Sequence, residues 1–455
     1  MTQLIKIKKG LDINLKGKPQ ETTKGSITSE YYTIYPDDYC GFVPKVAVKV
    51  GDKVLAGTPV FYDKNRPSIK VVAPVSGEIT AVNRGEKRRL LNVIIKADDS
   101  TQYEDFGKKD VKSLSSQTIK TALAEAGILA TVKQRPYDIV ANPEDSPRDI
   151  FVSGFYSTPL APNFEYILKG QESDFQTGLD ALAKITEGSV YLSVRPDASS
   201  TLKSAKGVTV VEFSGPHPAG NASVQINNIK PINKGEIVWA VDPQDVITIG
   251  KLFNKGIVDF TRLISLVGSE VKEDARCYYQ MITGASINTL VKGNVTEGID
   301  LRYISGNVLT GTQISSNDSL HAGNNQITVI PEGDEVNEFV GWISPGLNKF
   351  SVSKTYPAFL IEPLTKKEYT IDARIKGGKR AMIMSNEWDK VFPMDILPEF
   401  LIRAIIAFDI DKMENLGIYE VAPEDFALCE FVDTSKMELQ TIVRQGLDLL
   451  YKEMN

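Results

Sequence analysis

One loop in the middle of the chain gathers residues whose types suit ligand chemistry. Residues 213–220 read Phe-Ser-Gly-Pro-His-Pro-Ala-Gly, with one histidine, two glycines and two prolines. A histidine can donate a proton to a ligand, or it can be a turn residue bonded to backbone. The prolines on both sides of His217 favour the structural role. We still keep His217, Gly215 and Gly220 as candidates for contact with a small molecule.

Other site chemistries lack the residues that they need. Cys40, Cys277 and Cys429 are far apart and form no CxxC pair, so we expect neither a disulfide framework nor a self-contained iron–sulfur or zinc–thiolate site. The sequence has two histidines, His217 and His321, which are too few to favour a histidine-based metal site. Neither lies near a recognisable nucleophile signature. The sequence has no G-x-G-x-x-G or Walker A motif. We therefore predict no catalytic residue and no metal ligand.

The charge is uneven along the chain. The 455 residues carry a formal charge of −6, and 42% of them are apolar. Residues 1–97 nevertheless hold 17 lysines and arginines against 9 aspartates and glutamates, so a basic front precedes an acidic body. A basic front can meet an anionic partner or the cytoplasmic face of a membrane. Lys87, Arg88 and Arg89 are the candidate docking residues, with a solvated turn as the alternative.

No segment predicts export or membrane insertion. The start, Met-Thr-Gln-Leu-Ile-Lys, lacks the apolar core and cleavage site of a signal peptide. No run approaches the ~18 apolar residues that span a bilayer. We therefore expect a soluble, cytoplasmic protein.

Residues 42–96 read as two matched β-halves around one turn. Short apolar runs are separated by the turn signals Gly-Asp, Gly-Thr-Pro and Ser-Gly. The pattern Val-Gly-Asp-x-Val…Gly-x-Pro followed by Ala-Pro-Val-Ser-Gly resembles the lipoyl/biotinyl sandwich of acyl and carboxyl carriers. A carrier needs a modifiable lysine at the tip, and Asp63-Lys64 lies in roughly that place. Because the tip is long and contains Pro67, we favour an unmodified structural sandwich over residues 1–100, wrapped by residues 1–30.

The next part alternates strands and helices. Strand–helix–strand alternation predicts a parallel, doubly wound, Rossmann-like sheet within residues 101–255. Ligands of such sheets bind beyond the carboxyl ends of the strands, and residues 213–220 lie at such an end. The predicted strands are 149–155, 189–194 and 207–213, and the predicted helices are 119–126 and 175–185.

Two further domains complete a mixed α/β, multidomain fold. Residues 256–334 predict a small β-grasp domain of the SLBB type, and residues 335–455 predict a few strands followed by helices, so that this last domain is mainly helical. The β-grasp strands are expected at 260–268, 277–283, 302–306, 308–311 and 326–331, with a short helix at 286–291. The last helices are expected at 396–408 and 438–452.

The order of these domains, together with several local motifs, resembles one known family. The motifs are Ile5-Lys6-Ile7-Lys8-Lys9-Gly10-Leu11-Asp12, Val72-Ala73-Pro74-Val75-Ser76-Gly77, the loop 213–220, Ile304-Ser305-Gly306-x-Val308-Leu309-x-Gly311, Pro393-Met394-Asp395-Ile396-Leu397-Pro398 and Ala427-Leu428-Cys429-Glu430-Phe431-Val432. The chain is similar throughout to the A subunit of the bacterial sodium-translocating NADH:quinone oxidoreductase. The motifs are specific because they occur in this order over nearly the whole chain.

The resemblance implies a peripheral subunit on the cytoplasmic side of the bacterial inner membrane. It would belong to a six-subunit respiratory complex that uses NADH, flavins, iron–sulfur, quinone and Na+, with other subunits as partners, a membrane-embedded one above all, and no nucleic acid. Related subunits of complex I and of the Rnf complex keep a flavin loop or cluster cysteines. Here the glycine-rich flavin loop is missing and Cys429 stands alone. Asp433 occupies the place where some members of the family carry another cysteine.

The resemblance therefore predicts a scaffold without a cofactor of its own. A quinone-proximal role is a further implication, for which the candidates are the His217 loop and Trp388 beside the Pro393 loop. Two alternatives from other classes stay open: a biotinyl or lipoyl carrier modified on Lys64, and a stand-alone oxidoreductase that binds flavin or nucleotide.

Overall fold

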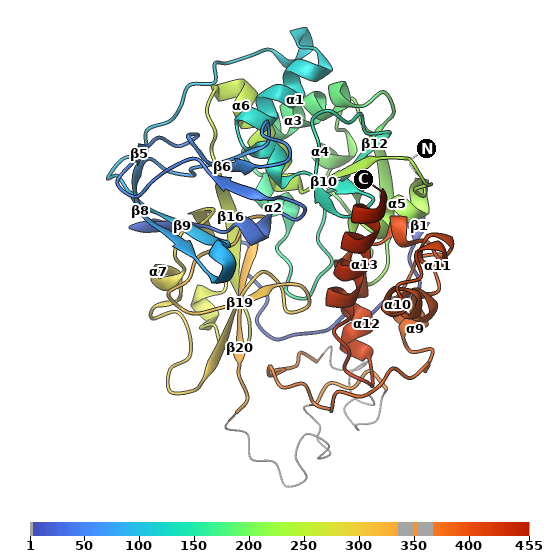
Figure 1. Cartoon of the computed structure of the whole chain (residues 1–455). Coiled ribbons are helices and arrows are strands. Elements are labelled where there is room, and N and C mark those ends of the chain that lie inside the picture. Colours follow the sequence, from blue (N-terminus) through green and yellow to red (C-terminus); the bar gives the residue numbers. More distant parts are fainter. Residues whose placement is uncertain (1–2, 335–348, 354–366, 455) are drawn as a thin grey trace.

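The structure is a computed structural model that describes residues 3–334, 349–353 and 367–454. Four β-sheets and several groups of helices build it (Figure 1). We divide it into a sandwich unit (residues 31–97), a parallel-sheet unit (116–255), a mixed-sheet unit (261–331) and a helical unit (388–454). The helical unit lies on the opposite side of Figure 1 from the sandwich unit.

The sandwich unit consists of two small antiparallel sheets. Val60, Phe61, Ile79, Val93 and Ile95 are fully buried in the core of this unit. One sheet has the order β3-β9-β8-β5, with bounds Tyr31–Ile34, Leu90–Ala97, Gly77–Arg84 and Lys53–Val54. The other has the order β4-β6-β7, with bounds Pro44–Val46, Pro59–Asp63 and Lys70–Val72.

The parallel-sheet unit has the strand order β1-β14-β13-β12-β15-β10-β11. Its first five strands are parallel, as predicted for this part of the chain, and β10 runs antiparallel to β15. The bounds are Gln3–Lys6, Thr209–Ser214, Val190–Val194, Asp149–Ser153, Val238–Val241, Lys133–Arg135 and Ile139–Val140.

Helices α1 (Ser116–Glu125), α3 (Glu172–Ile185) and α6 (Pro243–Lys255) share one core with this sheet. Helices α3 and α6 approach closely at two glycines: a Cβ on Gly250 would lie 1.7 Å from the carbonyl oxygen of Asp174. A Cβ on Gly178 would lie 2.0 Å from the carbonyl oxygen of Val246. The short helices α2 (Phe164–Leu168) and α4 (Ser200–Lys203) and helix α5 (Ala222–Ile229) complete the unit.

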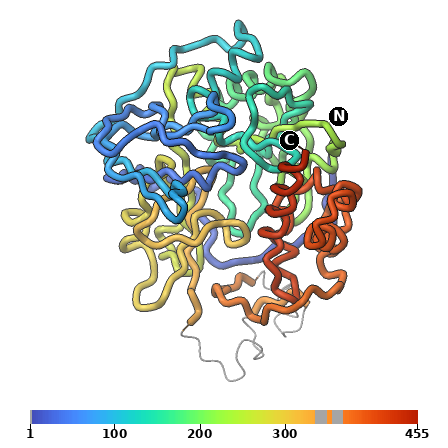
Figure 2. Tube along the Cα trace, in the orientation of Figure 1, coloured from blue at the N-terminus to red at the C-terminus, as the bar shows by residue number. Residues whose placement is uncertain are grey.

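The prediction that residues 1–30 wrap the sandwich is wrong. Strand β1 extends the parallel sheet beside β14, and β2 (Thr23–Ile27) pairs in parallel with β17 of the mixed-sheet unit. Figure 2 shows this dark blue segment crossing the molecule between the two units. Both strands are mostly exposed edge strands, so they lack the apolar alternation that would have identified them. Their pairing partners lie some 200 residues or more away in the sequence.

The mixed-sheet unit has the order β19-β18-β20-β16-β17-β2. A strand predicted at 308–311 is instead a turn, because the Asn307 side chain accepts hydrogen bonds from the backbone N–H groups of Leu309 and Thr310. The strand begins only at Thr312. The bounds of β19, β18, β20, β16 and β17 are Thr312–Ile314, Leu301–Ser305, Gln326–Pro331, Thr261–Val267 and Tyr278–Ile282, and α7 is Asn288–Val291.

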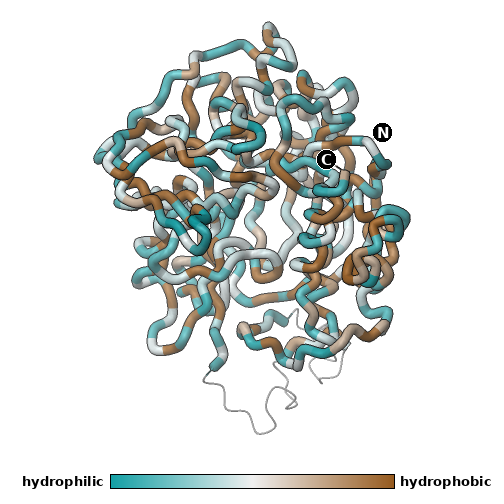
Figure 3. The backbone as a smooth tube through the Cα atoms, in the orientation of Figure 1, coloured by the Kyte–Doolittle hydropathy of each residue, from teal (hydrophilic) through white to brown (hydrophobic). Residues whose placement is uncertain are grey.

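The helical unit packs around a core that includes Trp388, Leu401 and Leu447. In Figure 3, hydrophobic and hydrophilic stretches alternate along the helices of this unit. The two long predicted helices are present as α10 (Pro398–Ile406) and α13 (Leu439–Met454). The other helices are α9 (Trp388–Val391), α11 (Ile410–Asn415) and α12 (Ala427–Val432).

The few strands predicted before these helices are not found in the described residues. Within 349–353 and 367–454 the β-pairing is one bridge, between Tyr369 and Leu15. The rest of that prediction falls on 335–348 and 354–366, outside the described residues. Among the described helices, none is long and apolar enough to cross a membrane.

Candidate functional site

The strand order of the parallel sheet marks where a ligand would be expected. From β12 the chain continues outward to β13 and β14 on one side and then returns to place β15 on the other side. Open parallel sheets bind ligands in the crevice beyond the carboxyl ends of the strands at such a reversal. The loops after β12 and β15, which begin at Gly154 and Asp242, border this crevice.

Side chains of the protein itself fill the crevice. Asp242 accepts hydrogen bonds from the Tyr156 hydroxyl (3.0 Å to Oδ2) and from Arg262 Nη2 (2.8 Å to Oδ1). The amide of Asn325 donates to the same carboxylate at 3.1 Å. Arg262 lies on β16 and Asn325 just precedes β20, so the mixed-sheet unit supplies two of the four groups. We call Tyr156, Asp242, Asp245, Arg262 and Asn325 the crevice plug.

The electrostatics of the crevice plug favour a fixed structure. Arg262 is 4% exposed, and its Nη1 lies 2.5 Å from Oδ1 of Asp245. Burial opposes its charge, but Asp245 and Asp242 outweigh burial and raise the pKa of Arg262. Burial also raises the pKa of Asp245, against the attraction of Arg262. Gln244 Nε2 donates to Asn325 Oδ1 at 2.8 Å, so the plug is hydrogen-bonded throughout. This arrangement closes the crevice and joins two units.

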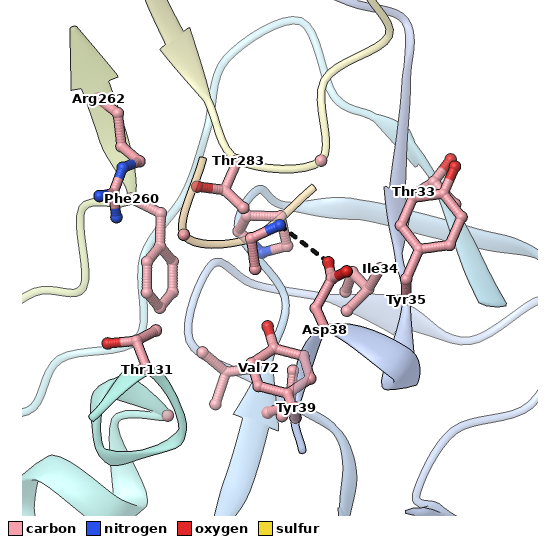
Figure 4. Close-up of a pocket in the computed structure, with 16 residues that line it drawn as sticks. Thr33, Ile34, Tyr35, Asp38, Tyr39, Val72, Thr131, Phe260, Arg262 and Thr283 are labelled. Carbon is pink, nitrogen blue, oxygen red and sulfur yellow. Dashed lines mark hydrogen bonds between the residues drawn. The ribbon is translucent and has the colours of Figure 1, made fainter. Parts of the chain in front are cut away.

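A hollow lies on the other side of Arg262, where the sandwich, parallel-sheet and mixed-sheet units meet. Its volume is about 500 Å³ with the open mouth included, and water can occupy about 30 Å³ of it. In Figure 4, Phe260 and Arg262 lie on one side of this hollow and Tyr35 and Thr33 on the other. The remaining lining residues are Ile34, Asp38, Tyr39, Val71, Val72, Pro74, Gly127, Thr131, Thr283, Gly284, Ala322 and Gly323. We call it the junction pocket.

One polar wall of the junction pocket is fixed by a second histidine. The Oδ1 atom of Asp38 lies 2.6 Å from Nδ1 of His321, and its Oδ2 accepts the Ala322 N–H at 2.8 Å. The Tyr35 ring stacks on His321 with centroids 4.2 Å apart. Sequence reasoning missed this pocket, because its walls come from segments more than 200 residues apart and no local motif marks them.

The structure brings His217, Gly215 and Gly220 together, but in a structural role. His217 is 2% exposed, and its Nδ1 lies 2.9 Å from the Ser157 hydroxyl, which also accepts the Gly220 N–H. Burial lowers the pKa of His217 to about 4, so the ring is neutral at neutral pH. Its backbone N–H donates to Asp12 at 2.9 Å.

The same loop holds the N-terminal segment. A Cβ on Gly10 would lie 2.2 Å from the His217 carbonyl oxygen, so a side chain there would block the approach. Gly215 faces Ile7 in the same way, at 2.1 Å. Ser157 and His217 form no catalytic triad, because Asp12 bonds the backbone of His217 and not its ring.

Trp388 is a core residue of the helical unit. It is fully buried, and its indole N–H donates to Asp433 Oδ1 at 3.3 Å. Asp433 also accepts the Met437 N–H, so this carboxylate holds the segment just before α13. The backbone N–H of Gly10 donates to the Lys390 carbonyl on α9, which links this region to the His217 loop.

The predicted docking residues form the tip of the β8–β9 hairpin. Lys87 and Arg88 are exposed and have positive φ angles of 51° and 61°. Arg89 pairs with Asp37 at 2.7 Å in an exposed ion pair. Lys87 and Arg88 therefore offer the more available charges of the three.

The sandwich tip around Lys64 is packed against the next unit. Lys64 is exposed, but Arg66 at the same tip donates to the carbonyls of Val140 and Gly41, both at 3.0 Å, and pairs with buried Asp63. A carrier must present its lysine on a free tip. These contacts hold the tip in place and support the structural sandwich.

The described residues contain no group of three or more His, Cys, Asp or Glu side chains arranged to hold a metal ion. Cys277 and Cys429 are buried, Cys40 is partly exposed, and all three are free thiols. Burial raises the pKa of Cys429 well above its usual value, which disfavours the thiolate that metals and clusters require.

Fold and site together define a class: a multidomain α/β protein with a barrel-sandwich front, whose parallel-sheet crevice is closed by its own side chains. Three family models match successive parts of the chain. They are the NqrA N-terminal barrel-sandwich hybrid domain (residues 5–98), the NqrA second alpha/beta domain (114–258) and the NQRA C-terminal domain (263–316).

Relatives match over the full length. The A subunit of the Na(+)-translocating NADH-quinone reductase of Pasteurella multocida (strain Pm70) is 35% identical over 99% of this chain and 100% of the relative. The protein of the same name from Rhodopirellula baltica is 35% identical over 98% of each chain. The chain belongs to the NqrA family, the A subunits of the Na+-translocating NADH-quinone reductase. A solved NAD+-reducing [NiFe]-hydrogenase covers 51% of this chain and 52% of its own at 12% identity with a TM-score of 0.34, a likeness too low to carry an argument.

Proposed function

We propose that this chain is a peripheral, cytoplasmic-side subunit of a sodium-translocating NADH:quinone reductase and carries no redox cofactor of its own. The relatives' name supports membership of such a complex. The absence of a spanning helix among the described residues is consistent with attachment to membrane-embedded partners. NADH, flavins, iron–sulfur, quinone and Na+ belong, on this proposal, to the complex as a whole.

The crevice plug is the observation that carries the cofactor-free part of the proposal. A dinucleotide or flavin at this Rossmann-like sheet would need the space beyond β12 and β15, which Tyr156 and Arg262 occupy. Displacing Arg262 would leave the buried carboxylate of Asp245 and the partly buried carboxylate of Asp242 without their cation, and this is costly. The chain therefore acts as a scaffold, and electrons pass through its partners.

Quinone contact, if this subunit makes it, belongs to the junction pocket. His217 and Trp388 are buried and already bonded, so this pocket replaces them as the candidate. Phe260, Tyr39 and Val72 give it an apolar surface beside the Thr283 side chain, the mixture that binds a small ring with polar edges. Because water has only about 30 Å³ there, a quinone ring must move side chains apart as it enters.

A pocket-filling variant tests the quinone part. In the assembled complex, Thr283→Phe should raise the KM for quinone severalfold and leave NADH oxidation by an artificial acceptor unchanged. Thr201→Phe, on the exposed side of α4, is the control of equal bulk. An unchanged KM in Thr283→Phe would remove quinone from this pocket.

The basic hairpin tip is the proposed docking element of the sandwich unit. Reversing Lys87, Arg88 and Arg89 to Glu should weaken co-purification with the complex, and added salt should weaken the unmodified contact more than that of the variant. Lys206→Glu with Lys255→Glu reverses exposed lysines of the parallel-sheet unit as a control. Equal recovery of both variants would contradict the docking role.

A further inference from the structure

The outer face of α10 carries an unusual concentration of exposed apolar side chains. Leu397 is 55% exposed, Phe400 47%, Ile406 47% and Phe408 73%. Phe400, Arg403 and Ile406 follow one another at three-residue spacing, so they share one face of the helix. Met384, 41% exposed, contacts this face through Arg403. We call Met384, Leu397, Phe400, Arg403, Ile406 and Phe408 the α10 face.

The backbone at the end of α10 is strained in a way that keeps one of these side chains exposed. Phe408 donates its N–H to the Ile405 carbonyl and Asp409 donates to the Ala404 carbonyl, the two hydrogen bonds of a Schellman motif. In this motif, the residue that donates the first of these two bonds adopts a left-handed conformation and is usually glycine. Phe408 occupies it with φ +55°. Phe408 therefore departs from two local preferences: non-glycine residues avoid the left-handed conformation, and aromatic rings are usually buried.

The charged group in the face also lacks a carboxylate partner in the described part of the chain. The Arg403 guanidinium instead contacts the Met384 sulfur, with Nη1 and Sδ 3.1 Å apart. Methionine, arginine and aromatic residues are the types enriched at the centres of protein interfaces. The α10 face therefore has the amino-acid composition of a protein interface, although its apolar side chains are exposed.

The charge around the face identifies the kind of partner. Asp395, Asp409 and Asp411 lie at the surface around the face, against one lysine, Lys412, which gives the face an acidic rim. An anionic lipid surface would be repelled by this rim. The cytoplasmic loops of membrane-embedded proteins are instead enriched in lysine and arginine.

We infer that the α10 face is a second docking surface of this protein, and that it receives a basic cytoplasmic loop of a membrane-embedded partner. Apolar side chains of the loop cover Phe400, Ile406 and Phe408, and a carbonyl or carboxylate of the partner accepts from Arg403. The inference rests on the proposed membership of the complex. It adds an interface in the helical unit, across the molecule from the sandwich unit (Figure 1).

Three variants of the full chain separate binding from folding. Phe408→Gly removes the ring and places the preferred residue in the left-handed position, so the melting temperature should stay equal or rise. Phe400→Ser shortens the face, and Arg403→Ala removes its hydrogen-bond donors while Arg403→Lys keeps a donor. Ile299→Ser, at a 41% exposed apolar residue of the mixed-sheet unit, is the control.

The measurement is the dissociation constant of each purified variant for membranes that contain the complex without this subunit. We expect at least tenfold weaker binding for Phe408→Gly, Phe400→Ser and Arg403→Ala, and binding close to wild type for Ile299→Ser and Arg403→Lys. Wild-type affinity in the first three would overturn the inference. Failure of the unmodified chain to bind would overturn the proposed function and the inference with it.

Two further measurements identify other possible occupants of the α10 face, a lipid surface and a second copy of this chain. If phosphatidylglycerol-containing vesicles without protein bind the wild type, and Phe408→Gly abolishes that binding, the face is a lipid contact and the inference is wrong. If the wild type dimerises in solution and Phe408→Gly makes it monomeric, the face joins two copies, which also contradicts the inference.

Discussion

Two buried arginines join the parallel-sheet unit to its neighbours, and they differ in how fully their N–H donors are hydrogen-bonded. Arg262 reaches in from the mixed-sheet unit, and its donors bond to Asp242, Asp245 and Asn325. Arg135 lies on β10 and faces the helical unit, where its Nη2 is 3.5 Å from Glu424 Oε1. It also pairs with Asp138, but its Nε has no hydrogen-bond partner in the structure.

The carboxylates around the two arginines differ as well. Arg262 faces two aspartates inside a closed network. Arg135 faces Asp138, Glu424 and the nearby buried Asp425, and Asp425 is held by Asn221 and by the Ala422 N–H. Lys133 and Arg444 also attract the charge of Asp138, whereas burial raises the pKa values of Glu424 and Asp425. We call the first junction, with its buried ion pair, the lock. The second junction changes charge near neutral pH, because the pKa of Glu424 is raised to about 7.

The largest effect is expected from breaking the lock. Arg262→Ala leaves the buried carboxylate of Asp245 and the partly buried carboxylate of Asp242 without a cation, so the free energy of unfolding should fall by about 3–5 kcal/mol. Denaturant unfolding at neutral pH measures this loss. Adding Asp242→Asn and Asp245→Asn to Arg262→Met should recover much of it, and no recovery would contradict the ion-pair account.

A smaller loss is expected at the second junction. Arg135→Met should lower the free energy of unfolding by about 2 kcal/mol at pH 8, because a charged hydrogen-bonded group is lost but Glu424 stays partly in water. The loss should shrink at pH 5, where the raised carboxyl pKa values allow protonation. A loss equal to that of Arg262→Ala at both pH values would erase the distinction between the junctions.

The smallest effect isolates one carboxyl group. Burial and the repulsion of Asp425 raise the pKa of Glu424 to about 7, above its ordinary 4.5. The folded state then holds a proton that the unfolded state has lost, so this group costs stability as pH rises from about 4.5 to about 7. Because its side chain is 44% exposed, water screens part of the effect. Glu424→Gln should flatten that part of the stability-against-pH curve, whereas an unchanged slope would assign it elsewhere.

Much of the fold could be predicted because many of its strands, helices and turns are marked by short-range sequence patterns. The alternation around Ile79 and Val93, the stripe of Phe175, Leu179 and Leu182, and the turn signals of the sandwich are short-range features. Strands β1 and β2 could not be predicted, because exposed edge strands have no apolar face and their partners are remote. The strand prediction for 308–311 was wrong because Asn307 closes a turn within an apolar run.

The candidate site was predictable only in part. The loop 213–220 lies at the carboxyl end of β14, as expected from strand–helix alternation. Its histidine is buried and bonded, which the flanking prolines had favoured. The crevice plug was not foreseen: Tyr156, Asp242 and Arg262 belong to three segments, and only tertiary packing brings an arginine of one unit to the crevice of another.

The central claim is that the crevice of this protein is closed to nucleotides. Calorimetric titration of the purified full chain with FMN, FAD and NADH tests it most directly. We predict no binding with a dissociation constant below about 1 mM, which corresponds to about −4 kcal/mol. Micromolar binding of any of the three, or flavin that stays with the chain through purification, would contradict the account.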